Sequence, residues 1–232
     1  MSGQKSDKGQ ATSDKLKHLT SYFVLTALPC HLSPVPCTPT CPLAVLYSYM
    51  LLYIMSFIEL VRSRYSCRKF SDKPVEKAKL DLCLEAARLA PSACNSQPWK
   101  FLIIDDPALK DKVCEAAFSG QYSSNSFGKN APVIVVVISE KGTFMARVGN
   151  LVRDTRFYLI DIGVAVEHFI LQAAEQGLGT CWMGWFNETA LKKALNLPKS
   201  VKVDIIFPVG YPAQPNREKI RKTMKEISGY NS

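Results

Sequence analysis

One long apolar helix constrains this chain more than any other segment. Residues 153–176 carry the strongest helical pattern, and residues 157–174 are apolar on nearly every side. Four polar residues interrupt this run: Asp161, Glu167, His168 and Gln172. Because a helix that is apolar on most faces must be buried on most faces, the sequence predicts that it pairs with its own copy at the centre of a dimer. Gly163 and Ala165 are small enough to let two such helices approach closely.

The rest of the pattern alternates helices with short strands and shows no regular βαβ period, which predicts an α+β fold. Further helices are expected at residues 56–64, 76–89, 106–118 and 188–195. Strands are expected at residues 100–104, 132–139, 179–183 and 201–209. The second of these strands is a continuous β-branched run, which is typical of a strand buried on both faces. Residues 120–130 are polar and serine-rich, so a loop is expected there.

The composition suits a globular protein that does not act on nucleic acid. Of its 232 residues, 47% are hydrophobic and 21% are charged, a balance that fits one domain or one domain plus a tail. The net charge of +9 comes from Lys and Arg scattered beside Asp and Glu, as on a solvated surface. The eight cysteines show no Cys-x-x-Cys spacing. We therefore predict reduced thiols, a cytoplasmic protein and no metal site.

The first 54 residues differ in composition from the rest. Residues 18–58 contain no Asp, Glu, Lys or Arg and include two apolar runs. Three interpretations stay open: residues 19–58 associate with a membrane, the first run belongs to a signal peptide, or Met55 is the biological start. We favour the last, which divides the chain into a tail at residues 1–54 and a domain at residues 55–232.

A small, amide-rich loop joins a helix pattern to the strand at residues 100–104. It reads Ala-Pro-Ser-Ala-Cys-Asn-Ser-Gln-Pro-Trp over residues 90–99. Pro91 ends the helix, and Pro98 biases Gln97 toward an extended conformation. The Ser, Asn and Gln side chains offer hydrogen-bond donors and acceptors without charge, which suits a flat ligand with polar edges. An ordinary helix-to-strand connection is the alternative.

Three side chains that suit a phosphate group alternate upstream of this loop: Arg64, Ser66 and Arg68. In an extended segment, alternate side chains point the same way, so two guanidinium groups and a hydroxyl group converge. Such a set fits a phosphate monoester. Lys219 and Arg221 form a second alternating pair near the C-terminus. A basic surface loop and a solvated charged tail are the alternative interpretations.

Four motifs, in this order, resemble those of the nitroreductase family of flavin enzymes. The first two are Arg-x-Ser-x-Arg-x-Phe, starting at Arg64, and Pro-Ser-x-x-Asn-x-Gln-Pro-Trp, starting at Pro91. The others are Gly-Leu-Gly-Thr-Cys-Trp-Met-Gly at residues 177–184 and Pro-Val-Gly-Tyr-Pro at residues 208–212. The resemblance covers about residues 56–228. It implies a nitroreductase-like α+β fold, in which helices flank a central mixed or antiparallel sheet, in an intertwined homodimer.

The resemblance also implies a site for flavin mononucleotide (FMN). The residues implied at its phosphate are Arg64, Ser66, Arg68, Lys219 and Arg221. The residues implied at the flavin ring and ribityl chain are Pro91, Ser92 and Asn95, and Gln97, Met183 and Gly184 are also implied to bind the cofactor. The Gly184 N–H is implied to point at flavin N5, where a donor stabilises charge on the reduced ring.

The function implied by the resemblance is an FMN-dependent oxidoreductase that uses NADH or NADPH. Hydride passes from nicotinamide to flavin N5, the first product leaves, and a small electrophile such as a nitroaromatic or a quinone then takes its place. We predict no catalytic acid or base, because the flavin performs the chemistry. The competing interpretation is a non-enzymatic flavin-binding or redox-sensing module, held at a membrane by residues 19–58. The sequence names neither the natural acceptor nor the preferred nicotinamide.

Overall fold

The computed structural model describes residues 55–140, 155–216 and 218–231. The chain divides between Ile54 and Met55, and every described residue belongs to the unit Met55–Ser232. The predicted tail therefore lies outside the described residues, and its origin and any membrane contact stay predictions.

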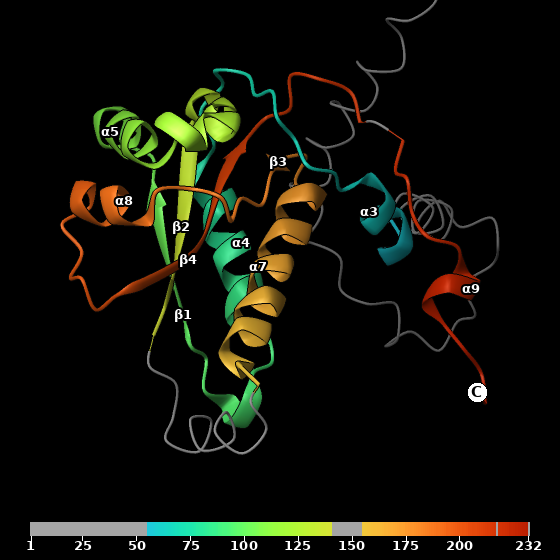
Figure 1. Cartoon of the computed structure of the whole chain (residues 1–232). Coiled ribbons are helices and arrows are strands. Elements are labelled where there is room, and N and C mark those ends of the chain that lie inside the picture. Colours follow the sequence, from blue (N-terminus) through green and yellow to red (C-terminus); the bar gives the residue numbers. More distant parts are fainter. Residues whose placement is uncertain (1–54, 141–154, 217, 232) are drawn as a thin grey trace, which may run out of the picture. The chain divides into compact units, whose positions relative to one another are not determined.

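Four antiparallel strands form the sheet of this unit (Figure 1). They are β1 (Trp99–Ile104), β2 (Val133–Ser139), β3 (Gly179–Thr180) and β4 (Lys202–Gly210), in the order β1-β2-β4-β3. The β-branched run of β2 suits a strand covered on both faces, and six of its seven residues are buried. The predicted α+β fold with a central sheet is confirmed, and the described strands are antiparallel rather than mixed.

Two pairs of helices cover the two faces of the sheet (Figure 1). The pairs are α4 (Lys77–Arg88) with α7 (Phe157–Glu175), and α5 (Pro107–Ala117) with α8 (Glu188–Ala194). The ring of Phe169 on α7 stacks on Phe101 of β1, with 5.8 Å between ring centroids. The same ring meets the edge of Phe207 on β4 at 5.2 Å. These aromatic contacts fix α7 on the sheet.

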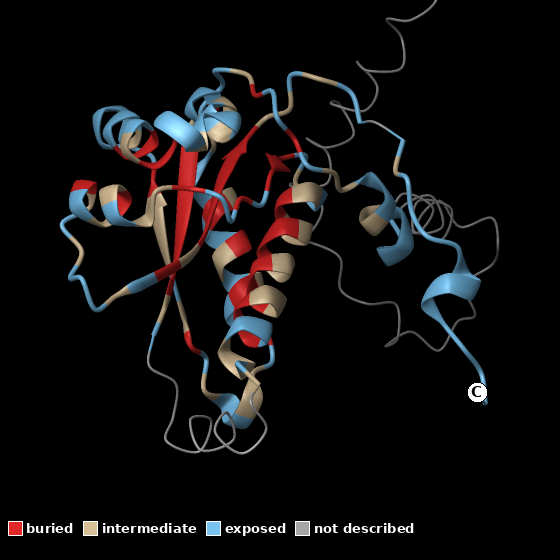
Figure 2. Cartoon of the chain, in the orientation of Figure 1, coloured by how far each residue is buried: buried red, intermediate tan, exposed pale blue. Residues whose placement is uncertain are grey.

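Within one chain, α7 is buried on one face only (Figure 2). Its buried residues face the sheet and α4, and Ala165 is fully buried among them. On the other side Leu159 is 40% and Ile160 is 55% exposed, and a Cβ atom added to Gly163 would meet no atom within 4 Å. The prediction that Ala165 contacts the same helix of a second chain is therefore wrong. Gly163, in contrast, lies on the open side of α7. By length and composition α7 is also apolar enough to cross a membrane, a property that core helices share.

Two short helices near the ends of the described chain, α3 (Phe57–Ser63) and α9 (Met224–Ile227), contain no buried residue (Figure 2). A capping box starts each of them, from Ser56 in α3 and from Thr223 in α9. The large apolar side chains in and beside them are 47–94% exposed: Met55, Phe57, Ile58, Ile220, Met224, Ile227 and Tyr230. The two terminal segments thus present apolar surface to solvent.

The structure differs from the predicted elements in three places. Gly120–Asn130 forms a series of 3-10 turns, named η3, rather than an open loop. The strand expected at residues 179–183 ends at Thr180, because the chain then leaves β4 and returns only for an isolated bridge between Met183 and Ile206. α9 follows the basic pair Lys219 and Arg221, in a stretch for which the sequence predicted no helix.

Candidate functional site

Basic residues from the two ends of the described chain line one cavity of about 480 Å³. Its lining residues are Arg64, Tyr65, Ser66, Arg68, Lys69, Gln214, Glu218, Lys219, Ile220 and Arg221. Five of these side chains are cationic and one is anionic. The structure therefore brings together all five residues that the sequence placed at a phosphate group.

Backbone pairing with β3 fixes the first of these segments. Ser66 forms a parallel bridge with Thr180, and the Cys67 N–H donates to the Thr180 carbonyl at 2.8 Å. The Cys67 side chain is fully buried against Gly179, where an added Cβ atom would lie 2.7 Å from the Cys67 Cβ. Only glycine allows this close approach. With Cys67 directed inward, the flanking residues Ser66 and Arg68 remain exposed, as the predicted alternation requires.

Two side chains hold the C-terminal segment against the first. The Tyr65 hydroxyl donates to the Gln214 carbonyl at 2.7 Å. The Lys219 ammonium donates to the carbonyls of Val61 and Arg62, each at 2.7 Å. These carbonyls belong to the last turn of α3, where backbone oxygens lack helical partners and favour a cation. The position of the second basic pair is thus tied to the first.

Like charges crowd this cavity. Burial, followed by the guanidinium groups of Arg64 and Arg221, lowers the pKa of the Lys219 ammonium below its ordinary value. Glu167 of α7 offsets part of this effect, and its Oε1 lies 3.8 Å from the Arg64 Nε. An anion bound here would relieve the repulsion, so the electrostatics favour a phosphate group.

The amide-rich loop is held in an unusual backbone conformation. Cys94, Asn95 and Gln97 have φ values of 52°, 50° and 44°, which L-residues adopt rarely. Gln97 is therefore left-handed rather than extended, contrary to the bias expected from Pro98. Local hydrogen bonds account for this, since the Gln97 N–H donates to the Ser92 Oγ and the Gln97 Nε2 donates to the Asn95 Oδ1, each at 3.0 Å. Backbone held in this region is often found where a ligand binds.

Asp161 ties this loop to the start of α7. Its carboxylate accepts hydrogen bonds from the Ala93 N–H at 3.0 Å and from the Ser96 hydroxyl at 3.5 Å. The basic cavity, in contrast, is attached to β3, which follows the end of α7 (Figure 1). A single chain thus places these residues in two groups, with the loop at the start of α7 and the basic cavity beside Glu167 and β3, toward its other end.

Comparison with known proteins is consistent with these motifs. The model of the Nitroreductase family matches residues 61–124 and 115–211, more than half of the 232-residue chain. The chain belongs to the nitroreductase family. A curated relative is a putative NADH dehydrogenase/NAD(P)H nitroreductase from Methanothermobacter thermautotrophicus, 26% identical over 164 residues, which are 69% of this chain and 79% of the relative.

Solved structures of nitroreductases share the fold of this chain. A nitroreductase family protein from Clostridium novyi NT has 32% sequence identity and a TM-score of 0.60, over 68% of this chain and 87% of that one. An FMN-dependent nitroreductase from Clostridium difficile R20291 has 27% identity and a TM-score of 0.61, over 76% and 99%. The predicted nitroreductase-like fold is therefore confirmed.

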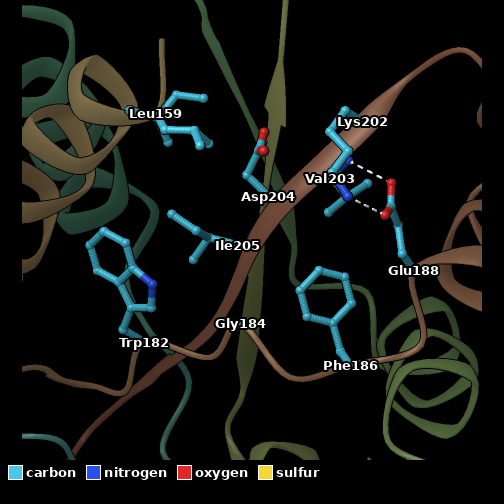
Figure 3. A pocket seen from close by; sticks show the side chains of 10 residues that line it. Leu159, Trp182, Gly184, Phe186, Glu188, Lys202, Val203, Asp204 and Ile205 are labelled. Atoms are coloured by element: carbon cyan, nitrogen blue, oxygen red, sulfur yellow. Dashed lines mark hydrogen bonds and ion pairs between the residues drawn. The ribbon is translucent and has the colours of Figure 1, made fainter. Parts of the chain in front are cut away.

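Met183 and Gly184, both predicted to bind the cofactor, differ in exposure. Met183 is buried, with its side chain in the core on the α5 and α8 face of the sheet. Its backbone N–H and carbonyl pair with Ile206 at 3.0 and 3.1 Å, so its side chain is a packing group. Gly184 is exposed and lines a second cavity of about 340 Å³ (Figure 3). Of the two residues, only Gly184 can be reached by a ligand in this cavity.

Two residues of the candidate site were not predicted from the sequence. Asp161 is 7% exposed and holds the loop, although the sequence showed it only as an interruption of an apolar helix. Phe127 lies under Arg68, with 5.9 Å between the guanidinium carbon and the ring centroid. The signal for Asp161 was present, since a lone carboxylate in an apolar run must find a buried partner. Nothing local in the sequence marked Phe127.

We predict that Asp161→Ala destabilises the protein by about 1–3 kcal/mol, because it leaves the half-buried Ala93 N–H without its acceptor. Asp161→Asn is the matched control, since its amide keeps one oxygen in place and should cost less. Urea unfolding followed by circular dichroism measures both changes. An Asp161→Ala protein as stable as the parent would show that this contact does not hold the loop.

Proposed function

We propose that this nitroreductase binds FMN and passes hydride from NADH or NADPH to a small electrophile, such as a nitroaromatic or a quinone, in a ping-pong reaction. The observation that carries this proposal is the basic cavity, in which residues 64–68 and 218–221 meet. The names of the relatives support it, since one is called an NAD(P)H nitroreductase and another an FMN-dependent nitroreductase. Continuous oxidation of NADH or NADPH, only when an acceptor is supplied, tests it; tight flavin binding without turnover would contradict it.

The residues at the cavity fit the phosphate of FMN. They offer an exposed hydroxyl on Ser66 and cations on both segments, and Arg64 and Arg221 each lower the pKa of Lys219, after burial, which is the larger cause. Arg64 and Arg68 would hold the phosphate, while Lys219, fixed by two carbonyls, sets its position. When bound, FMN supplies the hydride-transfer chemistry. Gly184, which has no side chain, leaves room for a flat ring to approach the backbone.

We predict that purified protein contains FMN rather than FAD, and that Arg64→Ala weakens FMN binding by about 1.5–3 kcal/mol, the range for a charged hydrogen bond. This corresponds to a roughly 10- to 150-fold higher dissociation constant. Arg62→Ala is the control, because this side chain is exposed on α3 and outside the cavity lining, while the carbonyl that binds Lys219 is kept. Chromatography identifies the released flavin, and fluorescence titration gives the affinities. Released FAD, or equal losses in both variants, would contradict the assignment.

We infer further that a second copy of the chain completes each flavin site. The loop at residues 91–97 and the basic cavity lie near opposite ends of α7, so one chain does not join them. If two α7 helices pair antiparallel about a two-fold axis, the start of one lies beside the end of the other. The open side of α7 around Ile160 and Gly163, together with the exposed apolar residues of α3 and α9, supplies the surface for this pairing.

Gly163→Arg is the appropriate disruption of this dimer, because the space beside Gly163 is open within one chain and the fold can accommodate the side chain. We predict that it lowers the molar mass measured by light scattering and the FMN occupancy together, since a charge is placed where apolar contact is expected. Thr189→Arg, at an exposed position on α8, is the control and should change neither quantity. A wild-type monomer that retains full FMN would contradict the proposed arrangement.

A further inference from the structure

The second cavity lies between the start of α7, residues 182–186, α8 and β4 (Figure 3). Its walls are of two kinds. The apolar wall consists of Leu159, Ile162, Trp182, Phe186 and Ile205. The polar wall consists of Glu188, Lys202 and Asp204. A cavity of this size, with aromatic walls and few polar groups, suits a small aromatic molecule.

Two of the three charged side chains already have partners. The Glu188 carboxylate pairs with the Lys202 ammonium at 2.5 Å and accepts the Val203 N–H at 3.1 Å, as Figure 3 shows. The Lys192 ammonium lies a further 3.3 Å from the same carboxylate. Glu188 and Lys202 therefore hold α8 against β4, and neither needs a ligand.

Asp204 differs from both. Its Oδ2 is buried and has no hydrogen-bond partner in the described part of the chain. Burial raises the pKa of this carboxyl group, although hydrogen bonding from Ser139 on β2 and the charge of Lys202 offset part of the effect, and the charge of Glu188 adds to it. In Figure 3 its oxygens lie between Leu159 and Lys202. A buried carboxylate oxygen without a donor is costly, and a ligand that donates a hydrogen bond would remove that cost.

We propose that this cavity is the acceptor subsite and that Asp204 selects aromatic electrophiles that carry a protonated amine. Trp182 and Phe186 supply the surface for the ring, and the uncommitted Asp204 oxygen receives the ammonium. Gly184 lines the same cavity, so an aromatic ring held there lies beside the residue that the proposed function puts at the flavin. This inference rests on the proposed function and adds the chemical class of the acceptor.

The test compares para-nitrobenzylamine, which is cationic at neutral pH, with para-nitrotoluene, which is neutral, and para-nitrobenzoate, which is anionic. The holoenzyme should reduce the amine with the highest kcat/KM of the three. Asp204→Asn should lower the ratio of kcat/KM for the amine to that for para-nitrotoluene by about 10- to 100-fold, the range for loss of one charged hydrogen bond. Asp81→Asn removes the same charge from an exposed position on α4 and should leave the ratio unchanged.

Equilibrium dialysis of para-nitrobenzylamine against the holoenzyme and its Asp204→Asn variant gives a second readout that needs no turnover. Weaker binding to the variant by a similar factor supports the inference. Equal binding, or equal kcat/KM ratios in an enzyme that reduces all three compounds, overturns the role of Asp204 and leaves the proposed function intact. Protein that binds the amine through Asp204 but oxidises neither NADH nor NADPH would instead contradict the proposed function.

Discussion

The packing of α7 on the sheet decides where the two parts of the proposed site lie. Phe169 sits between Phe101 and Phe207, so the helix cannot shift along the sheet without breaking aromatic contacts. Near its start, Asp161 holds the amide-rich loop. After its end, β3 pairs with the segment that carries Arg64, Ser66 and Arg68, the proposed phosphate-binding residues. A rigid helix between two fixed attachments keeps them apart, and the proposed second chain would bring the loop of one chain to the basic cavity of the other.

Backbone contacts hold the cations of the basic cavity together. Its cations are brought together by backbone pairing at β3 and by the carbonyls of Val61 and Arg62, rather than by neighbouring carboxylates. Burial lowers the pKa of the Lys219 ammonium most, and the guanidinium groups of Arg64 and Arg221 lower it further. A phosphate group therefore gains the attraction of every cation without having to displace ion-pair partners from most of them. Burial of Cys67 against Gly179 supplies the stability that keeps such a cluster in place.

Much of this fold followed from local patterns in the sequence, because helix and strand periodicity reports burial directly. The β-branched run of β2 and the apolar pattern of α7 are examples, and alternation alone placed Ser66 and Arg68 on one side of their segment. Three features depended on long-range contacts that no local pattern carries. Ala165 is buried within its own chain, Gln97 is left-handed through bonds to Ser92 and Asn95, and the roles of Asp161 and Asp204 depend on residues distant in the sequence.

Complementation between two defective chains tests most directly whether the flavin site is shared. One chain carries Arg64→Ala with Arg68→Ala, the other carries Ser92→Ala with Asn95→Ala, and the two are co-expressed with different tags so that the heterodimer can be purified. If each site takes its phosphate cluster from one chain and its loop from the other, the heterodimer contains one intact site and one site with both defects. The account predicts FMN binding of wild-type affinity at one site per heterodimer, although neither homodimer has such a site. A heterodimer with no wild-type site would show that each chain builds its own.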